Sequence, residues 1–86
     1  MTEMIRKEQI QHLTPIEENI LKVLQAHEGK AVSCETIYET VWQQKPFRCM
    51  PVVAVHIRHL RQKLENDPDH PEIILSHRSE GYSFQS

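Results

Sequence analysis

The chain has 86 residues, of which 38% are hydrophobic and 26% charged, and its formal net charge is -2. This length suits one small domain with a modest core. No apolar run approaches the roughly 20 residues of a membrane span, and the start, MTEMIRKEQI, lacks the apolar segment of a signal peptide. We therefore expect a cytoplasmic protein with no membrane partner. In that reducing compartment, Cys34 and Cys49 are expected to be free or buried thiols rather than a disulfide.

The charges are distributed unevenly along the chain. No Asp or Glu lies between Thr40 and Leu64, and this window carries the cations Lys45, Arg48, Arg58, Arg61 and Lys63. A basic face can attract phosphates even when the net charge is slightly negative. The alternative interpretation is an ordinary solvated helix face.

Residues 1–12 are polar and form either one short strand or an irregular lead-in. A first helix follows, because Thr14 is a favourable N-cap, Pro15 suits the first helical position and Glu17 completes a capping box. Gly29 is a natural end for this helix.

Ser33 caps a second predicted helix, whose apolar face carries Ile37, Tyr38, Val41 and Trp42. The stretch from Gln43 to Cys49 is then a loop, since Pro46 breaks the helical pattern. Phe47 in this loop is either anchored in the core or exposed for a partner, and anchoring is the commoner case.

A third helix is predicted from near Pro51 to about Asn66, before the two prolines of DPDHP. The end, EIILSHRSEGYSF, reads as two strands joined by a tight turn at Ser79, Glu80 and Gly81. Three helices followed by a hairpin define an α+β fold of the winged helix-turn-helix class, with a short or truncated N-terminal strand region. The expected organisation is a lead-in over 1–12 and one winged-helix domain over 13–86.

A helical wheel divides the third helix into two sides. Val53, Ile57, Leu60 and Leu64 share one stripe and should face the core. Val55 falls on the far side with Arg58 and His59. An exposed valine is unremarkable by itself, but on a DNA-reading helix it can pack against a thymine methyl while arginines bind guanine or phosphate.

Three segments resemble the OmpR/PhoB-type winged-helix output domain of bacterial two-component response regulators. They are LTPIEENILKVLQAHEGKAVSCETIYETVW, VVAVHIRHLRQKLENDP and IILSHRSEGYSF, in family order over residues 13–84. The resemblance implies sequence-specific binding of double-stranded DNA, with helix 51–66 in the major groove and wing 73–84 at the minor groove or backbone. It also implies a receiver domain in the full-length protein, two copies on direct repeats, and an isolated domain that is monomeric.

The resemblance also implies roles for particular residues. DNA-facing positions of the helix and wing fall on Trp42, Pro51, Val52, Val55, His56, Arg58, His59, Arg61, Ser76, Arg78 and Tyr82. The segment that contacts RNA polymerase in some family members falls on Gln43, Gln44, Lys45, Pro46, Phe47 and Arg48.

Several residues depart from the family pattern. Pro51 and His59 stand where arginine is common, Val52 replaces a hydroxyl or amide, and Ser83 replaces a frequent basic residue. Glu80 adds a negative charge to the wing turn. We therefore expect weaker DNA binding than in arginine-rich relatives, and an altered sequence preference.

Three alternative functions compete with DNA binding. A metal site is disfavoured because the spacings of Cys34, Cys49, His56 and His59 do not match a zinc finger. An enzyme is disfavoured because no phosphate loop or nucleophile motif is present, so no cofactor is expected. A winged-helix module that binds RNA polymerase or a receiver domain, with weak or no DNA binding, remains the alternative function.

Overall fold

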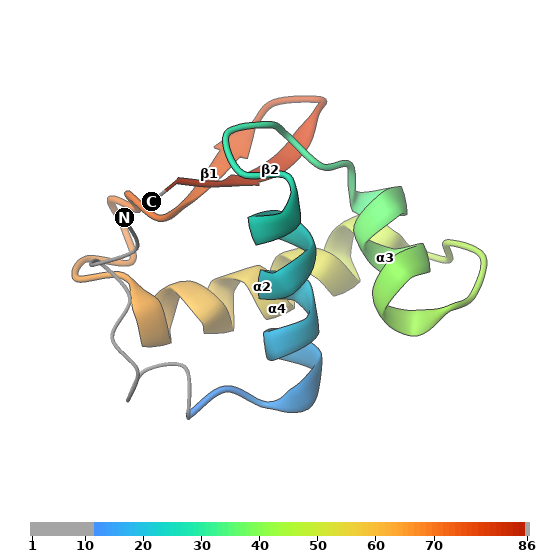
Figure 1. The fold of residues 1–86 in the computed structure, drawn as a ribbon, viewed down its shortest axis with the longest axis horizontal. Helices are drawn as coiled ribbons and strands as arrows, with labels where there is room; N and C mark the ends of the chain where they lie inside the picture. Colours follow the sequence, from blue (N-terminus) through green and yellow to red (C-terminus); the bar gives the residue numbers. More distant parts are fainter. Residues whose placement is uncertain (1–11, 86) are drawn as a thin grey trace.

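The computed structural model describes residues 12–85. The expectation for a strand or lead-in before His12 lies outside these residues. The described elements are helices α2 (Pro15–Ala26), α3 (Cys34–Trp42) and α4 (Cys49–Leu64), followed by strands β1 (Ile74–His77) and β2 (Gly81–Phe84). Figure 1 shows α2 crossing in front of α4, with α3 to one side and the hairpin at the top. The predicted winged-helix architecture is thus confirmed.

Helix α2 begins as its sequence predicts. The Thr14 hydroxyl accepts a hydrogen bond from the Glu17 N–H at 3.2 Å, and the Glu17 carboxylate accepts one from the Thr14 N–H at 3.0 Å. The helix ends at Ala26, three residues before the expected stop at Gly29. Gly29 instead has a φ of 82° and donates its N–H to the Phe84 carbonyl at 3.0 Å, so it turns the chain toward the hairpin.

Helix α4 is shifted relative to its predicted bounds. It begins at Cys49 rather than near Pro51, because Arg48 enters it in the left-handed conformation with a φ of 52°. Pro51 is tolerated there because first-turn N–H groups have no intrahelical acceptor. The helix ends at Leu64 rather than Asn66, because the backbone of Glu65 is already extended.

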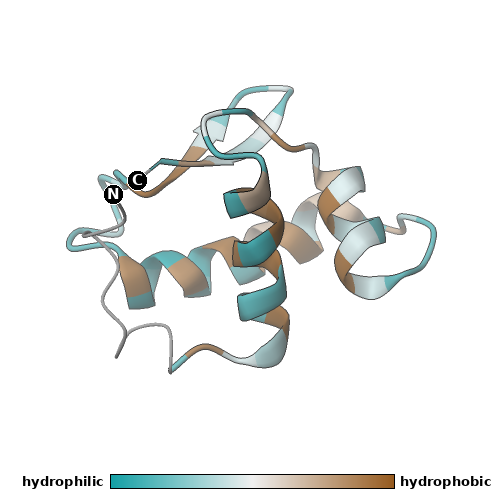
Figure 2. Ribbon diagram, viewed as in Figure 1, coloured by the Kyte–Doolittle hydropathy of each residue, from teal (hydrophilic) through white to brown (hydrophobic). Residues whose placement is uncertain are grey.

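The core lies where the three helices meet the hairpin. Its most deeply buried side chains are Ile20, Leu24, Ile37, Val53, Ile57, Leu60, Leu64, Ile73, Ile74 and Phe84. The four core positions predicted for the third helix, among them Val53 and Ile57, are all buried. Figure 2 shows apolar bands along the helices and mainly polar colour on the connecting turns. This packing fixes which side of α4 faces outward.

A side chain in the last turn of α4 and the side chain of the residue that follows this helix both bind the backbone leading into β1. The buried Glu65 carboxylate accepts hydrogen bonds from the N–H groups of Glu72, Ile73 and Ile74, at distances of 2.8–3.1 Å. One turn earlier, the Arg61 guanidinium donates from Nε and Nη2 to the Ile74 carbonyl, at 3.1 and 2.9 Å. Neither contact follows from a local pattern in the sequence.

The hairpin also pairs with the segment before α3. β1 and β2 are antiparallel, with Ile74 opposite Phe84 and His77 opposite Gly81. Val32 forms an additional bridge to Tyr82, through N–H to carbonyl bonds of 2.7 and 3.0 Å. Gly81 is required at this crossing, because its φ is 118° and an added Cβ would lie 1.9 Å from the Val32 carbonyl oxygen.

Gly29 and Gly81 form a matched pair of sites for testing the close contact between β2 and the backbone of Val32. Both have positive φ, but a Cβ at Gly29 would meet nothing within 4 Å. Gly29→Ala should therefore lower the free energy of unfolding by about 1 kcal/mol, from backbone strain alone. Gly81→Ala should lower it by at least about 3 kcal/mol, because the Val32 backbone must also move. Urea denaturation measures both, and equal losses would contradict the steric account.

An ion pair with a buried carboxylate makes the stability of the fold depend on pH. Glu17 Oε1 lies 2.6 Å from Lys63 Nζ, and the Glu17 side chain is only 4% exposed. Burial opposes ionisation of Glu17, but hydrogen bonds from Lys63 and the Thr14 backbone, together with the Lys63 charge, outweigh it and lower the pKa. A carboxyl whose pKa is lower in the folded state stabilises the fold above its unfolded pKa. This stability is lost as the pH falls through the folded pKa.

We expect Glu17→Gln to flatten the loss of stability between about pH 6 and about pH 3, because glutamine keeps the capping bond but carries no charge. Glu18→Gln, in the same helical turn, is the control for the change in net charge. Urea denaturation across this pH range is the measurement. An identical pH dependence in wild type and Glu17→Gln would refute the prediction.

Candidate nucleic-acid interface

The outward side of α4 carries most of the predicted DNA-facing residues. Pro51, Val55, Arg58 and His59 are exposed, whereas Val52 and His56 are half-buried. Val55 is 52% exposed, which confirms its placement on the side away from the core. Arg58 and Val55, three residues apart, share one helix face, so this surface combines a cation with an apolar group.

Aromatic side chains connect α3 to this surface. The rings of Tyr38 and Trp42 stack with centroids 4.9 Å apart, and the Trp42 ring lies 5.4 Å from that of His56. The His59 ring meets His56 edge-on at 6.4 Å. His56 is therefore half-buried against Trp42 at the margin of the outward surface.

Arg61 differs from Arg58 in what surrounds it. In addition to its bonds to Ile74, its Nη2 donates to the Ser76 hydroxyl at 2.8 Å, and its guanidinium carbon lies 5.8 Å from the centre of the Tyr82 ring. Burial lowers the pKa of Arg61, and the charges of Tyr82 and Glu65 oppose this effect. Three predicted contact residues thus form one cluster, in which Arg61 orients the wing.

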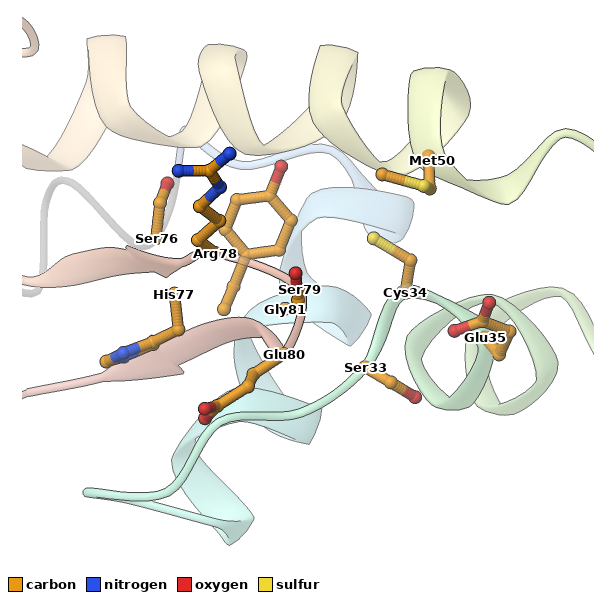
Figure 3. Close-up of a pocket in the computed structure, with 11 residues that line it drawn as sticks. Ser33, Cys34, Glu35, Met50, Ser76, His77, Arg78, Ser79, Glu80 and Gly81 are labelled. Carbon is orange, nitrogen blue, oxygen red and sulfur yellow. The ribbon is translucent and has the colours of Figure 1, made fainter.

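The wing turn brings Arg78 close to the helices. Arg78 and Glu80 are exposed, and both line a cavity of about 400 Å³ with Glu35 and Met50. Figure 3 shows Arg78 reaching toward α4 across this cavity, while Glu80 lies on the other side of the turn. By contrast, Ser83 is buried and hydrogen-bonded to His77 at 2.6 Å, so it is not part of the outward surface.

The loop before α4 is bracketed by two left-handed residues, Gln43 and Arg48. Of the two alternatives for Phe47, the structure shows the less common one, because its side chain is 69% exposed and not anchored in the core. The Arg48 guanidinium carbon lies 5.4 Å from the centre of the Phe47 ring, which gives the ring a local cationic partner. The loop from Gln43 to Arg48 therefore presents an aromatic side chain to solvent.

The missed residues differ in the signals that they left in the sequence. Glu65 lies four residues after Arg61, a spacing that puts both on one helix face, but nothing local indicates that both bind β1. Val32 gave no signal, because a single bridge has no strand pattern.

Among residues 12–85, no group of three or more His, Cys, Asp or Glu side chains could hold a metal ion. No helix in this part of the chain is long and apolar enough to cross a membrane.

Substitutions of Arg61 and Arg58 should have different effects on the stability of the fold, because only Arg61 is hydrogen-bonded to the wing. Arg61→Met should lower the free energy of unfolding by about 2 kcal/mol, because the Ile74 carbonyl and the Ser76 hydroxyl lose their charged donor. Arg58→Met should change it by less than about 0.5 kcal/mol, as for an ordinary surface substitution. Thermal and urea unfolding of the two variants is the measurement, and a stable Arg61→Met protein would contradict the proposed role in the wing.

Comparison with known proteins gives consistent matches. The family model described as "Transcriptional regulatory protein, C terminal" matches residues 7–84. The "Probable transcriptional regulator ycf27" of Galdieria sulphuraria is 44% identical over 85 residues, which cover 96% of this chain and 33% of that protein. Regulatory protein VanRc of Enterococcus gallinarum is 43% identical over 73 residues, covering 85% of this chain and 32% of its own length. The chain therefore spans about a third of these relatives.

Solved structures agree with these matches. The response regulator DrrB of Thermotoga maritima, titled an OmpR/PhoB homolog, superposes with a TM-score of 0.77 at 33% identity, over 87% of this chain and 34% of that chain. The RstA DNA-binding domain of Klebsiella pneumoniae, solved in complex with the RstA box, gives a TM-score of 0.77 at 25% identity, over 85% of this chain and 72% of that chain.

Proposed function

From the membership of this chain in the family of C-terminal, OmpR/PhoB-type domains of transcriptional regulators, we propose that it binds double-stranded DNA sequence-specifically as the effector domain of a two-component response regulator. Helix α4 enters the major groove, and the wing lies at the minor groove or the phosphate backbone. The protein acts in the cytoplasm, with a receiver domain in the full-length protein and two copies on direct repeats. The isolated domain is a monomer.

The observation that carries this proposal is the outward face of α4. The core stripe of α4 is buried, which leaves Val55 and Arg58 exposed on the other side. Arg58 supplies donors for guanine or phosphate, and Val55 supplies an apolar contact for a thymine methyl. Arg78 extends the surface to the wing, where a cation can enter the minor groove. Within the proposed interface, Trp42, Ser76 and Tyr82 approach the backbone, and Pro51, Val52, His56, His59 and Arg61 complete the helix side.

The carboxylates at the wing limit this interaction. Glu80 and Glu35 line the same cavity as Arg78, and both carry the sign of the phosphates. With Pro51 and His59 at positions where cations are common, few phosphate contacts remain. We therefore propose that this domain binds DNA more weakly than arginine-rich relatives at matched salt, with a different sequence preference.

A second proposal concerns the loop from Gln43 to Arg48. Its exposed Phe47, backed by Arg48, favours contact with a protein surface, because aromatic and arginine side chains are enriched at interfaces. We propose RNA polymerase as the partner of this loop when the domain is on DNA. If DNA binding is absent, the same loop supports the alternative of a winged-helix module for protein interaction.

Duplexes selected from a random-sequence pool test the DNA proposal. The logarithm of the association constant should fall linearly with the logarithm of the salt concentration, and Arg58→Ala and Arg78→Ala should each reduce this slope by about 1. Lys22→Ala, which removes an exposed cation on α2, should leave the slope unchanged. Fluorescence anisotropy at several salt concentrations measures it. Binding that is absent or insensitive to salt would overturn the proposal and favour the interaction module.

A further inference from the structure

Gln62 lies on the outward face of α4 together with residues that carry the proposed DNA interface. It follows Val55 by seven residues, which is two helical turns less about 20°, so the two side chains leave the helix in nearly the same direction. Both are exposed, and the buried stripe that includes Val53 and Leu60 lies on the opposite side. Gln62 therefore faces the same way as the apolar residue of the proposed interface, two turns further along the helix.

The cations next to Gln62 are engaged in holding the fold together. Arg61 is hydrogen-bonded to the backbone of β1, and Lys63 Nζ lies 2.6 Å from the Glu17 carboxylate. By contrast, no hydrogen bond to another of residues 12–85 holds the side-chain amide of Gln62. In the last turns of α4, this amide is therefore a donor and acceptor that the fold leaves available to a ligand.

The surroundings of Gln62 favour the edge of a base over a phosphate. Gln62 borders a cavity of about 300 Å³ that Arg58 and Asp69 also line, so open space adjoins its amide. The Asp69 carboxylate has the same sign as a phosphate and repels one at this end of the helix. A base edge carries no net charge, and adenine presents in the major groove an N7 acceptor and an N6 donor that a glutamine amide can meet together.

We infer that Gln62 reads an adenine in the major groove, an inference that rests on the proposed DNA binding. Its Nε2 donates a hydrogen bond to N7 of the base, and its Oε1 accepts one from the N6 amino group. Seven residues span about 10.5 Å of helix, and successive base pairs are about 3.4 Å apart. The adenine therefore lies about three base pairs from the thymine whose methyl group contacts Val55.

The test uses duplexes that the wild-type domain selects from a random-sequence pool. We expect a preferred adenine at one position, about three base pairs from a preferred thymine. Replacing this adenine by 7-deazaadenine removes the N7 acceptor, and should weaken binding of the wild type by about 5-fold or more. The same replacement should have little effect on Gln62→Ala, whose donor is already absent. The two changes form a double-mutant cycle that isolates this one contact.

Salt dependence separates the reading of a base from the binding of a phosphate. Gln62→Ala should lower the affinity for the selected duplex but leave the salt slope unchanged, because the amide carries no charge. Gln85→Ala removes an exposed amide outside α4 and is the matched control. It should keep the wild-type affinity and the wild-type response to 7-deazaadenine. Thermal unfolding of Gln62→Ala should match that of the wild type, since an exposed side chain is removed.

An equal loss of affinity on 7-deazaadenine substitution in the wild type and in Gln62→Ala would overturn the inference. So would a reduced salt slope in Gln62→Ala, or a wild-type selection with no adenine preference at that distance. In each of these cases the wild type still binds, so the proposed DNA binding stands. Failure of the wild type to bind any duplex would instead overturn the proposed function, and this inference with it.

Discussion

The relative position of helix α4 and the wing depends on two ionised side chains that bind the same short stretch of backbone. Glu65 accepts from the three successive N–H groups that lead into β1, and Arg61, one helical turn earlier, donates to the carbonyl of Ile74. Hydrogen bonds to charged groups are stronger than those between neutral groups. The two contacts also meet the polar requirements of backbone that would otherwise be buried without partners.

This arrangement explains why the arginines of α4 are not equivalent. Arg58 and Arg61 lie three residues apart on the same helix, yet Arg58 extends into solvent, whereas the guanidinium of Arg61 is held by Ile74 and Ser76. A helical wheel places both near the outward face, because it contains no information about the strand that follows. The predicted contact residues therefore include one whose main observed role is to position the wing.

The sequence predicted the parts of the fold that depend on local signals. The capping box at Thr14, the buried stripe through Val53 and the turn at Gly81 each follow from a pattern within a few residues. Its errors arose where distant segments meet. Helix α4 starts earlier than predicted because Arg48 adopts a left-handed conformation, and no local sequence pattern decides that Phe47 is exposed.

The bridge between Val32 and Tyr82 joins residues that are far apart in the sequence. An isolated two-stranded hairpin is at best marginally stable in water, so the wing depends on a segment synthesised long before it. Contacts of large sequence separation slow folding, because the intervening chain must be ordered to form them. On the ribosome, helices α2, α3 and α4 emerge first, and part of their apolar surface stays exposed to solvent until the hairpin follows. The core is completed only when Tyr82 and Phe84 have left the exit tunnel, so this domain is bound to fold late in its own synthesis rather than as it is made.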